Sequence, residues 1–231
     1  MPNKPLNRSL HTAKATKQDE FYTQLSDIEK ELRHYAKHFK GKTVLCNCDD
    51  PKISNFFHYF SHNFEKLKLK KLITTCYKNC DADLFSKHTD QRGIWLEYDG
   101  DKDGDRVPGP DEIGIHTLKG DGDFRSEECI KLLKQADIVV TNPPFYPVGA
   151  GRINPDHQKA VARHELHGTL SDFITAAAFL LKQSGRLFAV YPCSRITDLI
   201  AEMRQKGRVK QVPYDTKLKV HIVFDLGVGQ A

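Results

Sequence analysis

The sequence lacks any apolar run long enough to cross a membrane. Its apolar stretches fall well short of the roughly 20 residues that a bilayer-spanning helix requires. The first 18 residues also lack the apolar segment of a secretory signal. We therefore expect a cytoplasmic protein without a membrane partner. With 39% hydrophobic residues among 231, the chain has enough apolar side chains to form a core.

Cysteine and histidine patterns typical of metal sites are missing as well. The pairs in C-N-C at 46–48 and C-Y-K-N-C at 76–80 do not have the C-x2-C spacing of a zinc ribbon, so we expect reduced, buried thiols. H-E-L-H at 164–167 differs from the zinc motif H-E-x-x-H. The acidic run 99–105 is similar to the start of a calcium loop, but Pro110 replaces the required final glutamate. A solvated hairpin turn explains that run better, and no metal is expected.

Positive charge is concentrated at the two ends of a chain whose net charge is +5. Residues 1–18 contain four basic side chains and no acidic one, and basic residues recur between 204 and 219. Basic ends suit a polyanion such as nucleic acid, although they equally serve ordinary solubility. We predict a flexible basic arm over 1–18 and a single domain over 19–231.

Helix-like and strand-like segments alternate along that domain. A hairpin insertion is expected at about 93–119. The predicted helices span 19–40, 50–69, 126–136, 169–185 and 194–207, with Ser126 as an N-cap and Gly185 closing the fourth. The predicted strands span 42–50, 70–77, 137–145 and 186–192, followed by a terminal pair at 209–216 and 217–229. This alternation predicts an α/β fold with a parallel sheet covered on both faces.

D-I-V-V-T-N-P-P-F at 137–145 carries the clearest functional motif. Ligands of open parallel sheets bind at the carboxyl ends of strands, where this motif lies. Pro143 and Pro144 have no N–H, so carbonyl acceptors stand beside the amide oxygen of Asn142. These acceptors suit the two hydrogens of an exocyclic amino group on a base, and Phe145 can stack on the ring. A base inside a duplex must be flipped out to reach such a site.

N-P-P-F resembles the signature of amino-methyltransferases that use S-adenosylmethionine. Residues from about 10 to 145 resemble the EcoRI-type adenine-specific DNA methyltransferases, in the segments D-E-F-Y-T-Q, V-L-C-N-C-D-D-P, L-K-K-L-I-T, K-G-D-G-D-F-R-S and A-D-I-V-V-T-N-P-P-F. From Pro143 onward the chain is similar to tRNA adenine methyltransferases that modify valine tRNA. Recombination, an engineered chimera or a divergent family would each produce such halves.

The resemblance implies a class I S-adenosylmethionine-dependent fold, which is Rossmann-like with a mostly parallel seven-stranded sheet and helices on both faces. It implies methyl transfer to the exocyclic amino group of adenine in DNA, with Asn142, Pro143, Pro144 and Phe145 as catalytic residues. The same chemistry on tRNA is the first alternative. A catalytically inactive nucleic-acid-binding protein of the same fold is the second.

The first predicted strand ends without the glycine-rich loop common in this fold. The resemblance implies that Asn47, Asp49 and Asp50 take its place around S-adenosylmethionine, although Asp50 alone also suits a helix cap. The remaining cofactor-binding candidates are Phe21, Tyr22, Thr23, Tyr77, Asp121, Asp123, Phe124 and Asn142. Among these, Phe21 also suits a core position, and 120–124 also suits a simple turn.

The loop that follows the motif supplies the substrate-binding candidates. In the tRNA family the matching segment lies on the substrate side. Basic and imidazole side chains there are expected to contact phosphate. The substrate-binding candidates are Tyr146, Arg152, Lys159, Arg163 and His164.

Overall fold

A computed structural model describes residues 23–47, 54–76, 92–105, 107–150, 153, 160, 164–166, 168–182, 185–205 and 220–224. The predicted basic arm, 1–18, and the first arm of the terminal strand pair, 209–216, lie outside these residues. Most of the loop between 151 and 167 lies outside them as well.

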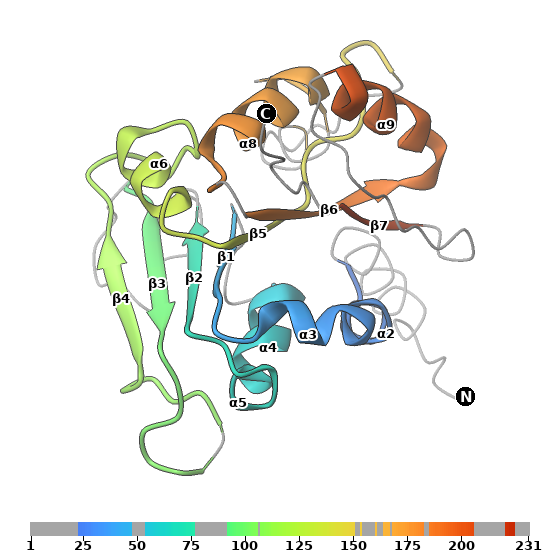
Figure 1. Ribbon diagram of the computed structural model, residues 1–231. Helices are drawn as coiled ribbons and strands as arrows, with labels where there is room; N and C mark the ends of the chain where they lie inside the picture. The colour runs from blue at the N-terminus through green and yellow to red at the C-terminus, as the bar shows by residue number, and fades with distance from the viewer. Residues whose placement is uncertain are drawn as a thin grey trace, which may run out of the picture.

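A seven-stranded sheet forms the centre of the molecule, in the order β4-β3-β2-β1-β5-β6-β7 (Figure 1). Its strands are β1 Thr43–Cys46, β2 Lys71–Cys76, β3 Ile94–Tyr98, β4 Ile113–Thr117, β5 Ile138–Thr141, β6 Arg186–Pro192 and β7 Val220–Phe224. The predicted α/β architecture is confirmed, since helices separate most of these strands along the chain.

The sheet is mixed, which corrects the prediction of a mostly parallel one. Strand β1 pairs in parallel with β2 and with β5, and β5 pairs in parallel with β6. The β2–β3, β3–β4 and β6–β7 pairs are antiparallel. The predicted hairpin at 93–119 is the main cause, because it adds to the free edge of β2 as β3 and β4, and a hairpin brings antiparallel pairing with it.

Helices cover both faces of the sheet (Figure 1). The helical elements are α2 Leu25–Leu32, η1 Arg33–Tyr35, α3 Ala36–Phe39, α4 Asn55–His62, α5 Phe64–Leu67, α6 Glu127–Leu133, α8 Leu170–Leu180, η3 Cys193–Arg195 and α9 Ile196–Gln205. Elements α2 to α5 pack in one apolar cluster, and α6, α8 and α9 pack in another. The side chains of β1 alternate between the two clusters: Val44 and Cys46 pack in the first, and Leu45 packs in the second.

The ends of the helices follow the predictions only in part. Ser126 caps α6 as expected, because its hydroxyl accepts from the backbone N–H of Cys129 at 3.2 Å. Gly185 does not close α8, which ends at Leu180 because Leu181 already has extended backbone angles. Gly185 instead lies in the turn before β6, where its N–H donates to the Lys182 carbonyl at 2.8 Å.

The prediction of reduced, buried cysteines is also confirmed only in part. Cys46 and Cys129 are buried thiols, as the sequence predicts. Burial is also the main cause that raises the pKa of the Cys129 thiol. Cys76, at the end of β2, is disulfide-bonded, so the prediction of a reduced thiol is wrong at this position.

Asp137 connects the amino ends of the central strands. One carboxylate oxygen accepts from the backbone N–H of Thr43 at 2.9 Å, and the other lies 3.0 Å from the Lys182 ammonium. Burial alone would raise the pKa of Asp137. The Thr43 hydrogen bond and the Lys182 ion pair outweigh burial and hold that pKa below its ordinary value. The charged carboxylate therefore stabilises the β1–β5 pairing.

We predict that Asp137→Ala lowers the free energy of unfolding by about 2 kcal/mol at pH 7, the scale of hydrogen bonds to charged groups. Because the folded-state pKa is depressed, this contribution is present above the unfolded pKa of about 3.9 and is lost as the pH falls through the folded value. Urea unfolding of both proteins from pH 3 to pH 7 measures the difference, which should shrink below about pH 4.

The matched control is Glu127→Ala, which removes an exposed carboxylate paired with Lys131 on α6. Its effect on unfolding should be much smaller than that of Asp137→Ala. A loss at Asp137 that stays constant across this pH range would contradict the assignment.

Candidate active site

Two of the predicted site residues follow neighbouring strands that end at one edge of the sheet. Asn47 follows β1 and Asn142 follows β5, and these parallel strands are in register at Cys46 and Val140. The backbone N–H of Asn47 donates to the Val140 carbonyl at 2.8 Å, which extends this pairing beyond β1. The two predicted amides therefore come from neighbouring strand ends, where ligands of open α/β sheets bind.

Asn47 presents a buried acceptor at this edge. The residue is 8% exposed, and its side-chain oxygen has no hydrogen-bond partner within the described residues. A buried carbonyl oxygen without a donor costs roughly 1–3 kcal/mol, so the position favours a ligand that donates. This fits the predicted cofactor role, because S-adenosylmethionine carries amino and hydroxyl donors. Asp49 and Asp50, predicted beside it, lie outside the described residues.

The segment 120–124 reaches the same edge from the hairpin. Residue Ile94 of β3 is in register with Cys76 at the carboxyl end of β2 and with Thr117 at the end of β4. The chain after β4 therefore turns beside Gly93, whose N–H donates to the Gly120 carbonyl at 2.8 Å. The turn thus lies beside the start of β3, which pairs with the end of β2 at Cys76. Tyr77, predicted after β2, lies outside the described residues.

The two aspartates of this turn differ in what they contact. Both Asp123 carboxylate oxygens bind the Arg125 guanidinium, with N···O distances from 2.5 to 3.2 Å. Asp121 uses one oxygen to accept from the Asp123 N–H at 3.1 Å. Its side chain forms no ion pair among the residues described. Phe124 is half-buried, with the Arg125 guanidinium 5.9 Å from its ring centre. Asp121 is therefore the better acceptor for a cofactor.

Thr23 contacts the start of α4, the first described helix after β1. The Asn55 side chain, at the first position of α4, donates to the Thr23 carbonyl at 2.7 Å. The sequence reasoning missed Asn55, and a polar side chain at the start of the helix after β1 was the available signal. Phe21 and Tyr22, the other two predicted residues of this element, precede the first described residue.

The Asn-Pro-Pro-Phe segment combines an exposed amide with a fixed ring. Asn142 is exposed, and its side chain makes no hydrogen bond with any described residue. Pro143 is buried, while Phe145 is half-buried and packs on the cluster beneath α8 and α9. The segment therefore offers an accessible amide next to an aromatic face that the core immobilises.

Aromatic rings continue beyond the motif. Tyr146 is 43% exposed, with its ring centre 4.5 Å from Phe145 and 5.3 Å from His164. His164 is only 4% exposed, and its Nδ1 has no hydrogen-bond partner among the described residues. Its predicted contact with phosphate stays a prediction. Arg152, Lys159 and Arg163 lie outside the described residues.

Arg195 and Glu165 contact the motif although no sequence pattern singled them out. The Arg195 guanidinium donates to the Phe145 carbonyl at 2.7 Å and pairs with the Glu165 carboxylate. Both residues come from later in the chain, Arg195 from η3 and Glu165 from the loop before α8. For Arg195, the available signal was an arginine three residues after a strand, β6, that ends at this edge.

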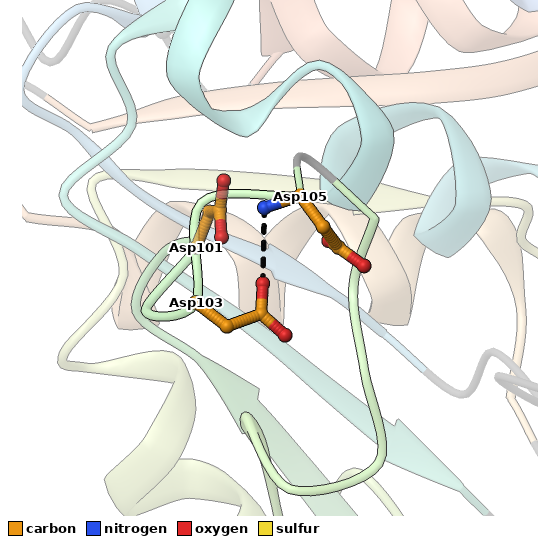
Figure 2. A group of neighbouring side chains, drawn as sticks. All are labelled: Asp101, Asp103 and Asp105. Atoms are coloured by element: carbon orange, nitrogen blue, oxygen red, sulfur yellow. Dashed lines mark hydrogen bonds between the residues drawn. The ribbon is translucent and has the colours of Figure 1, made fainter.

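The acidic run at 99–105 forms the tip of the β3–β4 hairpin, where carboxylate oxygens of Asp101, Asp103 and Asp105 lie within 4.8 Å of one another (Figure 2). Each accepts a backbone N–H two or three residues ahead, at 2.7, 3.0 and 2.6 Å respectively. The buried Glu112 carboxylate accepts from Gly109 N–H at 3.0 Å and also from Lys102 N–H. These bonds shape the turn and account for the acidic residues without a bound ion.

Comparison with known proteins adds to this geometry. Residues 9–148 match the family model described as "Adenine-specific methyltransferase EcoRI". The chain belongs to this family. The match covers β1 to β5 and the Asn-Pro-Pro-Phe segment, so it includes every cofactor candidate. Among the described residues, none of the helices combines the length and apolar character needed to cross a membrane.

Curated relatives match parts of the chain. This chain is 50% identical over 145 residues to the type II methyltransferase M.EcoRI of Escherichia coli. The matched region covers 63% of this chain and 44% of that protein. The chain is 45% identical over 134 residues to the type II methyltransferase M.MgeORF184P of Mycoplasma genitalium, covering 58% and 36% respectively. A tRNA1(Val) (adenine(37)-N6)-methyltransferase of Porphyromonas gingivalis is 40% identical over 63 residues, covering 27% and 24%. The chain therefore spans less than half the length of each relative.

We predict that Gly93→Ala weakens cofactor binding, because a Cβ there would meet backbone atoms of Gly122 at 2.6 Å and Asp121 at 2.8 Å. The 120–124 turn would have to move away from β3, carrying Asp121 and Phe124 with it. The dissociation constant for S-adenosylmethionine, measured by calorimetry, should rise about tenfold, equivalent to about 1.4 kcal/mol.

Gly120→Ala is the matched control, because a Cβ at that position meets nothing within 4 Å. It should bind as the wild type does. Equal affinities for the two variants would rule out a role for this turn in the cofactor site.

Proposed function

We propose that this chain transfers a methyl group from S-adenosylmethionine to the exocyclic amino group of adenine in DNA, on a class I methyltransferase fold. The observation that carries the proposal is the exposed Asn142 amide at the end of β5, while the neighbouring strand β1 ends at Asn47, whose buried oxygen has no partner among the described residues. Membership of the adenine-specific EcoRI family supports the same chemistry.

The cofactor side of the proposed site lies over the ends of β1 and β2. Asn47 and Asp121 supply acceptors, Phe124 supplies an apolar face, and Thr23 contacts the start of α4. The remaining proposed contacts come from Phe21, Tyr22, Asp49, Asp50 and Tyr77. When bound, the cofactor supplies an electrophilic methyl group, whose bond to sulfur breaks as a bond to the adenine nitrogen forms.

On the substrate side, Asn142 and Pro143 hold the reacting amine. The amide oxygen of Asn142 and the carbonyl of Pro143 accept its two hydrogens; neither oxygen has a partner among the described residues. These bonds orient the nitrogen lone pair and make it more available for attack. Phe145 stacks on the flipped base, and Pro144 keeps the turn rigid. The nitrogen releases its extra proton after the methyl group has transferred, so no base is required beforehand.

DNA is the favoured substrate, because two relatives at 45% identity or more are named type II methyltransferases. Methylation of tRNA is the second candidate, favoured by the shorter match to a tRNA1(Val) methyltransferase. In either case the exposed Tyr146 ring, together with Arg152, Lys159 and Arg163, is proposed to face the nucleic acid. An unpaired base of an RNA loop would cost less to bring into the site.

Transfer of a radiolabelled methyl group to duplex DNA and to bulk tRNA, measured in parallel, tests the substrate. Label in the DNA alone is expected, and label in tRNA alone would replace the first candidate by the second. Label in neither, with no thermal shift on adding S-adenosylmethionine, would favour an inactive nucleic-acid-binding protein.

We predict that Asn142→Ala lowers the rate of methyl transfer at least about 100-fold, the scale found when one oriented catalytic hydrogen bond is removed. Its thermal unfolding should be unchanged, since Asn142 is exposed and its side chain makes no hydrogen bond with a described residue. Gln135→Ala, which removes another exposed amide before β5 begins, is the control and should keep full activity. Near-normal transfer by Asn142→Ala would refute the mechanism.

A further inference from the structure

The backbone after β5 is no longer held by the hydrogen bonds of strand pairing. The pairing of β5 with β6 ends at Thr141 and Ala189, and after Asn142 the residues Pro143 and Pro144 have no N–H to donate. Within the described residues, segment 142–146 is held through carbonyl oxygens of its last two residues. Whatever donates to those oxygens determines where the motif lies.

Two donors fill this role, and they are coupled. The Arg195 guanidinium donates to the Phe145 carbonyl at 2.7 Å, and the backbone N–H of Glu165 donates to the Tyr146 carbonyl at 2.9 Å. The Glu165 carboxylate then pairs with the same guanidinium nitrogen of Arg195. The two contacts thus form one closed unit around the peptide between Phe145 and Tyr146, which we call the Arg195–Glu165 clamp.

The guanidinium itself is immobilised on further sides. Its Nε lies 3.0 Å from the Asp198 carboxylate, and its carbon lies 5.7 Å from the centre of the Tyr191 ring. The side chains of Arg195 and Glu165 are 19% and 8% exposed, so the ion pair is shielded from solvent. Burial opposes the charge on Arg195, but the hydrogen bonds to Glu165 and Asp198 outweigh it and raise the Arg195 pKa.

Tyr191 completes the surroundings as a neutral side chain. It is fully buried, and burial raises its pKa to about 12, so the phenol keeps its proton at physiological pH. The nearby acids, Glu165 and Asp198, also act against its ionisation, while Arg195 favours it. The Arg195 guanidinium therefore lies among two carboxylates, Glu165 and Asp198, and a buried phenol that stays neutral at physiological pH.

We propose that Arg195 and Glu165 are positioning residues for methyl transfer, acting through the Phe145 and Tyr146 carbonyls to fix the Asn-Pro-Pro-Phe acceptors. This inference rests on the proposed function of that motif. Two consecutive prolines give the segment stiffness, so fixing its far end also fixes Asn142 and Pro143. A displacement of about 1 Å at a reacting group costs on the order of 100-fold in rate, which gives the clamp its catalytic consequence.

Arginine suits this position better than lysine. A planar guanidinium presents several donors at fixed angles and reaches Phe145, Glu165 and Asp198 together. An ammonium is a point charge on a flexible stem and cannot keep all three contacts. Arg195→Lys should therefore retain the charge while holding the carbonyl less firmly.

The first test separates rate from binding. Arg195→Met should lower kcat for methylation of duplex DNA by about 100-fold, while KM for S-adenosylmethionine changes less than about threefold. The kcat values of Arg195→Lys and Glu165→Gln should lie between those of Arg195→Met and the wild type. Lys131→Met, which removes an exposed cation paired with Glu127 on α6, is the control and should leave kcat unchanged. Wild-type kcat in Arg195→Met, or equal losses in kcat and affinity, would overturn the proposal.

A second measurement does not depend on activity. Hydrogen exchange followed by mass spectrometry should show faster exchange in a peptide covering 145–150 for Arg195→Met, with β1 and β2 peptides unchanged. Unchanged exchange over 145–150 would overturn the clamp itself, and faster exchange throughout would reduce Arg195 to a general stabilising residue. If the wild type methylates neither DNA nor tRNA, the proposed function fails, and this measurement still decides whether the clamp exists. Loss of activity in Asn142→Ala with full activity in Arg195→Met would instead refute the positioning role alone.

Discussion

The parallel pairing of β1 with β5 is the contact on which the site depends. At the amino ends of the two strands, Asp137 binds the backbone of Thr43 and the Lys182 ammonium. At the carboxyl ends, the Asn47 N–H reaches the Val140 carbonyl. A slip of one residue would turn the alternating side chains of β1 to the opposite faces, and both apolar clusters resist that. The positions of the Asn47 and Asn142 amides follow from this register.

Segments before and after β5 in the chain meet at the same edge of the sheet. The β3–β4 hairpin joins the β2 side and brings the 120–124 turn back beside Gly93, where only a residue without a side chain fits. On the other side, η3 leaves β6 and carries Arg195 to the segment after β5. Among the described residues, Asn47 therefore lies at the end of β1 and Asp121 in the turn beside Gly93, while Asn142 and Phe145 follow β5. In the proposed function, the cofactor and the substrate would meet between these two groups.

Features that depend only on residues close together in the chain could be predicted from the sequence. The buried strand before Asn142 and the cap at Ser126 were both predicted correctly, since a strand period and a side chain three residues from its partner are local features. The antiparallel addition of the hairpin was not predicted, because it depends on which edge of the sheet is free. Gly185 was assigned to a helix end by its type alone, and α8 had already ended at Leu180.

The clamp shows most clearly why part of the site escapes sequence reasoning. Arg195 contacts residues 30 and 50 positions earlier in the chain, and no periodicity or spacing links such partners. The contacts of Arg195 also join a segment inside the family match to residues outside it. The EcoRI family match ends at residue 148, so it includes the Phe145 and Tyr146 carbonyls but neither Glu165 nor Arg195. The motif and the donors that hold it therefore come from different parts of the chain. In the proposed role, Arg195 and Glu165 hold the motif through its carbonyl oxygens, next to two prolines that cannot donate a backbone hydrogen bond.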